Sequence, residues 1–142
     1  MAAYVKYQSA INSLMEAINS GTDAWKIALS NTAPVVATDT TMTAGTTDLA
    51  TGNGYTAGGN ACSVTSHAQS GGVYKLVLAS PSTWTASVGN IGPFRYVLLY
   101  DSSASNALIA YWDYGSSITL NGTNGDTFQV TLDATNGTFQ VS

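Results

Sequence analysis

Charge is scarce in this chain of 142 residues. Only 8% of the residues are charged, whereas an ordinary soluble domain carries roughly 25%. The net charge is −4, and the only cations are Lys6, Lys26, Lys75 and Arg95. So few cations cannot form a basic patch, and we therefore expect no nucleic-acid partner. Ser, Thr, Asn and Gly cover the surface instead, a composition that suits a β-rich extracellular or virion protein better than a cytosolic enzyme.

Cysteine and histidine are almost absent. The single cysteine, Cys62, excludes an intrachain disulfide and a thiolate metal site, and we expect its side chain to be a small buried apolar group. The single histidine, His67, cannot build a zinc site of the usual three or four protein ligands. We expect His67 to be a turn residue and not a catalytic or metal-binding one.

Long apolar runs are also missing. No run approaches the roughly 18 residues that span a membrane, so we expect no membrane partner. The N-terminus lacks the basic and then apolar layout of a signal peptide, and we expect no signal-directed export. The length fits one domain, which can bury a core without disulfides or metals.

The most apolar part of the chain is the stretch 89–114. Apolar side chains occupy both alternating faces of residues 94–100, which predicts a central strand covered on both sides. A second apolar run covers residues 107–112, and the polar gap between the runs, 101–106, is rich in Ser and Asn, as a hairpin loop is. The core is therefore predicted to be a long antiparallel hairpin.

Shorter stretches of alternating apolar and polar residues surround this hairpin. They lie at 24–30, 61–66, 73–79, 83–86, 117–120, 127–132 and 139–141. Asn136-Gly137, between the last two, is a strong hairpin signal. Eight or nine short strands at this spacing predict a mainly β fold, an antiparallel β-sandwich of jelly-roll-like or Ig-like type.

One stretch, residues 4–19, has helical periodicity. Its apolar side chains recur at spacings of three and four, at Tyr4, Tyr7, Ile11, Leu14, Met15 and Ile18. Residues 1–21 are therefore predicted to form an N-terminal amphipathic helix or arm ahead of a β-domain at 22–142. The apolar stripe either packs on its own domain or docks onto a neighbouring subunit.

The segment 31–60 shows no periodicity and is predicted to be a long irregular loop. Loops of this length in a small domain are usually functional or contact-forming. Tyr55, its only aromatic residue, is either a loop anchor or a contact residue. The candidate contacts to another subunit or a partner are therefore Tyr4, Tyr7, Ile11, Leu14, Ile18 and Tyr55.

No constellation of catalytic residues is recognisable. The aspartates lie mostly at strand ends, where they usually accept backbone N–H bonds in turns. The spacing does not favour a converging Asp113–Asp126 pair, and the loop 121–126 lacks the acid density of a calcium loop. We therefore expect no catalytic residue, no metal site and no cofactor. The larger aromatics could stack on a sugar ring, or fill the core and the seams between subunits: Tyr55, Trp84, Tyr111, Trp112 and Tyr114.

The order of motifs resembles small structural proteins of tailed bacteriophages that decorate or cement the capsid. The motifs are DAWKIALSNTAP (23–34), NGYTAGG (53–59), TWTASVGNIGPFRYVLLYD (83–101) and IAYWDYGSSITLNGTNGDTFQVTLD (109–133), after an N-terminal helix. The resemblance implies a non-enzymatic β-sandwich subunit, a homo-oligomer with a trimer favoured, bound to the major capsid protein. It further implies a place on the capsid surface of the virion, after synthesis in the cytoplasm of the host bacterium.

A second class of function remains open from the sequence. The same chain could be a tail, fibre or baseplate module that binds host surface carbohydrate through exposed Trp or Tyr side chains. The two hypotheses differ in what the aromatics do, because a decoration protein buries them and a carbohydrate module exposes them in a groove.

Overall fold

The computed structural model describes residues 2–7, 20–71 and 73–141. Within these residues it contains ten β-strands and no helix, and thus no helix long and apolar enough to cross a membrane. The strands are β1 (Tyr4–Lys6), β2 (Trp25–Ser30), β3 (Asn60–Cys62), β4 (Val64–Ser70), β5 (Val73–Leu78), β6 (Trp84–Thr85), β7 (Ile91–Asp101), β8 (Ala107–Leu120), β9 (Thr127–Phe128) and β10 (Phe139–Val141). The predicted mainly β class with antiparallel sheets is confirmed.

The two longest strands, β7 and β8, form the hairpin that the apolar runs predicted. β7 lies between β8 and β2 in a five-stranded antiparallel sheet with the order β1-β8-β7-β2-β3. Paired residues of neighbouring strands share a face, so Leu29, Val97 and Trp112 point to one side. Leu98, on the other side of β7, is also buried, with 1% of its surface exposed. The central strand is therefore covered on both faces, as predicted.

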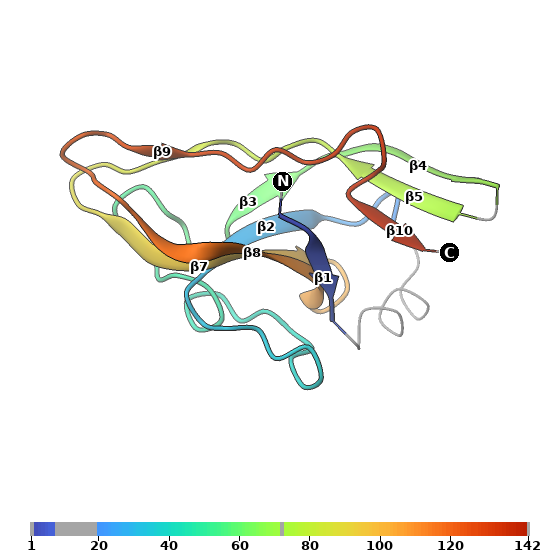
Figure 1. Cartoon of the computed structure of the whole chain (residues 1–142), viewed down its shortest axis with the longest axis horizontal. Helices are drawn as coiled ribbons and strands as arrows, with labels where there is room; N and C mark the ends of the chain where they lie inside the picture. The colour runs from blue at the N-terminus through green and yellow to red at the C-terminus, as the bar shows by residue number, and fades with distance from the viewer. Residues whose placement is uncertain (1, 8–19, 72, 142) are drawn as a thin grey trace.

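Two small sheets cover one face of the five-stranded sheet, which gives a sandwich-like arrangement (Figure 1). One has the order β10-β5-β4 and the other pairs β6 with β9. The core between the layers includes Trp25, Trp84, Phe94 and Phe139, each at most 2% exposed. Burial of these large rings adds to the apolar core that a chain with few charges needs for stability.

The opposite face of the large sheet is covered by the segment 31–59, which forms a third layer without named strands (Figure 1). It leaves β2 at Ser30 and reaches the edge of β8, where the amide of Leu108 donates to the Thr40 carbonyl at 3.0 Å. It then returns to β2, where the amide of Leu49 donates to the Leu29 carbonyl at 2.9 Å. The segment therefore runs across the sheet from β2 to the outer edge of β8.

The predicted N-terminal helix is wrong where the structure describes it. Tyr4–Lys6 form β1, which pairs antiparallel with β8 in the register Tyr4↔Trp112 and Lys6↔Ala110. Residues 8–19 of the predicted helix lie outside the described residues. The reason lies in the tertiary structure. The edge of β8 offers unpaired main-chain groups, and pairing with them as a strand outweighs the local preference for a helix that the spacing of the apolar residues indicated.

Candidate functional site

The candidate contact residues fall into three groups. Ile11, Leu14 and Ile18 lie outside the described residues. Tyr7 is 1% exposed and packs on Tyr111, with ring centroids 5.7 Å apart. Tyr4 is half-buried on β1, with ring centroids 6.2 Å from Trp112 and 6.4 Å from Phe139. Whether any of them contacts another chain stays a prediction.

Tyr55 is 2% exposed and anchors the segment 31–59 inside the chain's own core. Its hydroxyl donates to the Asp48 carboxylate at 2.6 Å and accepts from the Leu29 amide at 3.1 Å. The amides of Gly45 and Gly58 also donate to Asp48, each at 2.6 Å. Burial, together with the hydrogen bond to Asp48, raises the pKa of Tyr55, so the phenol stays a donor. A loop anchor is the role that this burial supports.

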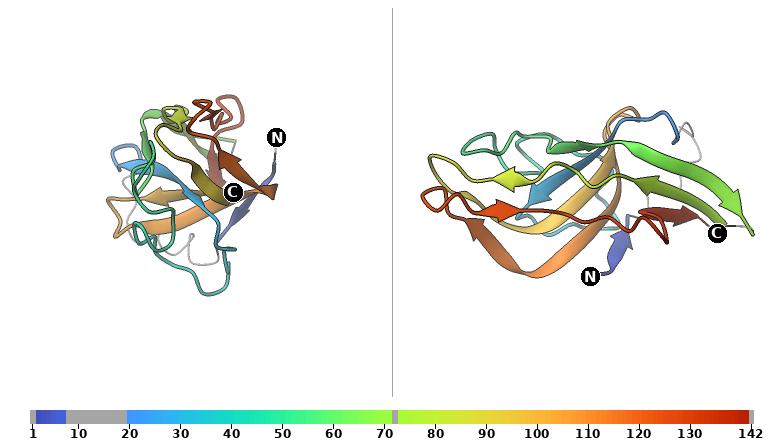
Figure 2. Two further views of the ribbon diagram at one scale, coloured as in Figure 1. Left: turned by 90° about the vertical axis from the view of Figure 1, so that its left-hand side faces the viewer. Right: turned by 90° about the horizontal axis from the view of Figure 1, so that it is seen from above.

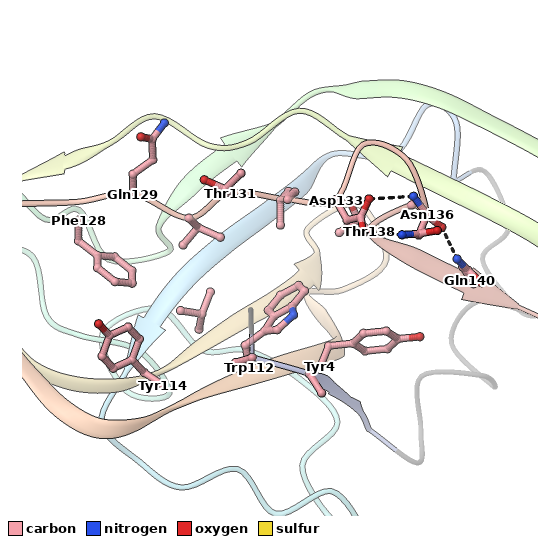
Figure 3. Close-up of a pocket in the computed structure, with 16 residues that line it drawn as sticks. Tyr4, Trp112, Tyr114, Phe128, Gln129, Thr131, Asp133, Asn136, Thr138 and Gln140 are labelled. Atoms are coloured by element: carbon pink, nitrogen blue, oxygen red, sulfur yellow. Dashed lines mark hydrogen bonds between the residues drawn. The ribbon is translucent and has the colours of Figure 1, made fainter.

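A groove of about 420 Å³ lies at one edge of the molecule and is here called the edge groove (Figure 3). It lies between β1 and β8 on one side and the segment 128–138 on the other. Its lining consists of Ala2, Ala3, Tyr4, Val97, Trp112, Tyr114, Phe128, Gln129, Val130, Thr131, Leu132, Asp133, Asn136, Gly137, Thr138 and Gln140. This volume is in the range of sites that bind small molecules or short peptide segments.

Aromatic rings form the floor of the edge groove. Trp112 and Tyr114 are two residues apart on β8 and therefore share a face, and Tyr4 stands beside Trp112 on the neighbouring strand (Figure 3). Tyr114 is 59% exposed, although it contacts Phe128 across the groove at 6.2 Å between ring centroids. The floor is therefore a strip of rings with a solvent-exposed end.

The wall opposite the floor is the segment 128–132. Phe128, Val130 and Leu132 are at least partly buried, whereas Gln129 and Thr131 are exposed. Phe128 holds this wall to the core through the ring of Phe94, at a centroid distance of 5.0 Å. The alternation places apolar side chains in the groove and polar side chains in solvent.

A compact turn at Asp133 ends the groove on its polar side. The Asp133 carboxylate accepts the amides of Thr135 and Asn136, each at 2.8 Å, and the side-chain amide of Asn136 at 2.9 Å. These hydrogen bonds, those from Asn136 first, hold the pKa of Asp133 below its usual range. Asp133 is the one charged side chain among the described residues that line the groove, so the site carries a single negative charge.

The carboxylates elsewhere are engaged in local contacts. Asp113 forms a bidentate pair with Arg95 at 2.7 and 2.8 Å, which lowers the pKa of Asp113, and Asp126 accepts the Asn121 amide at 2.9 Å. His67 lies within β4, not in a turn as we expected, and its ring packs against Gly21. In the part of the chain that the structure describes, no three His, Cys, Asp or Glu side chains gather as metal ligands.

Cys62 has the buried position that the sequence predicted. It is 5% exposed, and burial raises the pKa of its thiol to about 12. A thiol with such a pKa stays protonated at neutral pH and is a poor nucleophile. Cys62 therefore acts as a core residue on β3.

Comparison with the models of known protein families, with curated proteins and with solved structures found no match. The function therefore has to be argued from the chain itself and from the edge groove.

Sequence reasoning recognised some of the groove residues and missed the groove. Trp112 and Tyr114 were singled out as aromatics that could stack on a ligand, whereas Trp84 and Tyr55 from the same set are buried. The wall residue Val130 and the turn at Asp133 were not singled out. The signal that could have revealed the groove was the alternating stretch 127–132. A strand needs hydrogen-bonding partners on its edges, and the sequence near this stretch contains few further strand segments.

Proposed function

We propose that the chain is a non-enzymatic structural protein of a tailed bacteriophage that binds the capsid and stabilises it as a decoration or cement protein. The resemblance in motif order supports this proposal. The observation that carries it furthest is the edge groove, because an open, apolar, nearly uncharged groove suits contact with another chain better than a chemical reaction. The proposal includes a sandwich of jelly-roll-like or Ig-like type.

The physical chemistry of the chain fits such a role. A cement protein buries apolar and hydroxyl-bearing surface at its contacts, and it needs no titrating group there. With 8% charged residues, its contacts depend little on salt. We propose the major capsid protein as partner, a homo-oligomer with a trimer favoured, and a place on the capsid surface after synthesis in the bacterial cytoplasm.

The direct test of this proposal is the copy number of the chain in purified particles of the source virus, measured by quantitative peptide mass spectrometry. We expect a copy number comparable to that of the major shell protein. A few copies per particle would move the protein to the tail or neck. Complete absence from the particle would overturn the virion proposal.

A carbohydrate-binding tail, fibre or baseplate module is the second candidate, and the ring strip of Tyr4, Trp112 and Tyr114 favours it. Trp25 and Trp84 are at most 2% exposed, so Trp112 would report binding through its fluorescence. Titration with host surface polysaccharide should shift that fluorescence in the wild type and leave a Trp112→Phe variant silent. An unchanged wild-type spectrum would reject this candidate.

A further inference from the structure

The segment 127–132 has the sequence of a strand, yet its ladder stops early. Only β9, Thr127–Phe128, pairs with another strand, in the register Trp84↔Phe128 and Thr85↔Thr127. Among the described residues, the backbones of Gln129, Val130 and Thr131 make no hydrogen bond to a protein group.

Two hydrogen bonds fix which way each residue of this segment faces. The Asp126 carbonyl accepts from the Ala86 amide at 2.9 Å, and the Leu132 amide donates to the Ser80 hydroxyl at 3.0 Å. Successive residues of an extended chain direct their peptide groups to opposite edges, so even-numbered residues face the 80–86 side. The N–H and C=O groups of Gln129 and Thr131 therefore face outward, along the open edge of the layer.

The open edge of residues 129 and 131 lies above the parts of β8 and β1 that line the edge groove. Seen from above, the segment 128–132 forms the outer border of the upper layer, and β8 and β1 extend beyond it below (Figure 2). A strand added along this border would rest on Trp112 and Tyr114. A whole second sandwich would meet β8 and β1 before its own edge strand could approach. The space above β8 and β1 therefore suits a single extended segment.

The residues that line the edge groove determine which side chains a bound segment can carry. One face of the added strand would point to the aromatic floor and to Val130, which favours aliphatic residues at alternate positions. Asp133 is ionised at neutral pH and disfavours an acidic residue beside it. A saccharide has no apolar side chains at alternate positions to match this lining. It also has no regularly spaced main-chain groups that would pair with the peptide groups of residues 129 and 131.

We propose that the edge groove binds an extended, non-acidic peptide arm of a partner protein, added as an antiparallel strand along Gln129 and Thr131. The two residues together offer up to four main-chain hydrogen bonds, and the ring strip holds the apolar side chains. The inference rests on the proposed function only for the identity of the partner, which would be a segment of the capsid shell protein.

The probe is a fluorescent, capped hexapeptide with the sequence of residues 127–132, TFQVTL, which contains no acidic residue. When the peptide lies antiparallel to the segment 128–132 of the protein, the Phe of the peptide is opposite Leu132 and its Gln is opposite Thr131. The sequence is therefore self-complementary in this register. Two N-methylated forms separate main-chain pairing from simple apolar contact. One carries methyl groups on the amides matching Gln129 and Thr131, which would face the protein, and the other on the amides matching Val130 and Leu132.

We expect the second form to bind, as measured by fluorescence anisotropy, and the first to bind about tenfold or more weakly because its inward amides are blocked. In the protein, Thr131→Pro should weaken binding of the second form by about tenfold, and the matched Thr131→Ala, which keeps the amide, by less than about threefold. Circular dichroism and sedimentation velocity check that both variants are folded and keep the oligomeric state of the wild type.

Equal binding of the two methylated peptides would overturn the strand addition and leave a non-specific apolar groove. Failure of both peptides to bind the folded wild type would overturn it as well, as would self-association of the protein that Thr131→Pro abolishes. These outcomes are independent of the copy number in the particle, which tests the proposed function alone.

Discussion

Asp101, at the end of β7, is a buried carboxyl group beside a second carboxyl group. It is 3% exposed, its oxygen accepts the amides of Ser103 and Ala104 at 2.8 and 3.2 Å, and it contacts the side chain of Asp23. Burial, and after it the hydrogen bond and charge of Asp23, raise the pKa of Asp101 from 3.8 to about 6. Between about pH 4 and pH 6 the folded chain therefore keeps a proton here that the unfolded chain has released.

This raised pKa predicts an unusual pH dependence of stability. The contribution of Asp101 is fully present below pH 4 and is lost as the pH rises through about 6, because ionisation is then more costly in the folded chain. Asp101→Asn, which mimics the neutral form, should become more stable relative to the wild type by about 2 kcal/mol between pH 4 and pH 7. Urea unfolding at a series of pH values measures this difference, and a difference that does not change with pH would contradict the account.

Val88 is a second unusual residue, fully exposed at the tip of a turn. Its φ of 70° lies in a region that β-branched residues rarely adopt, and the Gly89 amide donates to the Ser87 carbonyl at 2.8 Å to close a three-residue γ-turn around it. Such a turn is strained when its central residue has a Cβ atom.

Val88→Gly should therefore stabilise the protein by about 0.5–1 kcal/mol, since relief of strain outweighs the added freedom of the unfolded chain. Val88→Ala keeps the Cβ atom and is the matched control, with little change expected. Both are measured as shifts of the thermal midpoint. A destabilised Val88→Gly would show that the turn is not strained.

At the scale of elements, the segment 31–59 depends on the contact between Tyr55 and Asp48. Tyr55→Phe removes the donor to Asp48 and the acceptor for the Leu29 amide, and should cost about 2–3 kcal/mol in the free energy of unfolding. Tyr100→Phe is the comparison, because its hydroxyl donates only to the Gly58 carbonyl, at 2.7 Å, a neutral bond worth about 1 kcal/mol. Equal costs for the two variants would argue against a special role for Asp48.

The prediction that depends most on burial concerns the central strand β7. Leu98→Ala removes a side chain that is 1% exposed and should cost about 2–5 kcal/mol, because the cavity cannot collapse between two covered faces. Val35→Ala, at a position 52% exposed, should cost less than about 0.5 kcal/mol. Urea denaturation distinguishes the two, and a cost near zero for Leu98 would mean that β7 is not central.

The elements that the sequence predicted well are those with their partners nearby in the chain. The apolar run 94–100 and its neighbour at 107–112 became β7 and β8 because a short polar gap joins them. The stretch 127–132 was predicted as one strand, but its pairing ends at Phe128, and the Leu132 amide donates to the Ser80 hydroxyl and not to a main-chain carbonyl.

The hairpin signal at Asn136-Gly137 did not join neighbouring strands. β10 pairs instead with β5, in the register Phe139↔Leu76, so the turn carries the chain to a distant edge. Local turn chemistry predicts the reversal and cannot predict which edge receives the strand, since that depends on burial of Phe139 in the core.

At the scale of the whole molecule, the edge groove arises because the two layers differ in width. The five-stranded sheet extends beyond the two-stranded β6–β9 sheet, and no local pattern in the sequence reveals that difference (Figure 2). Composition predicted the character of the surface, since a chain with 8% charged residues exposes amides, hydroxyls and rings. The groove combines these groups with an unpaired strand edge.

The central claim is that Gln129–Thr131 form an open strand edge that accepts a strand from another chain. Amide hydrogen exchange of these residues, measured in the free protein and in the protein bound to purified particles, tests it most directly. The account predicts that the amides of Gln129 and Thr131 exchange rapidly in the free protein and become protected in the bound state, while amides of β7 are protected in both. Protection of Gln129 and Thr131 already in the free protein, or fast exchange in the bound state, would contradict the account.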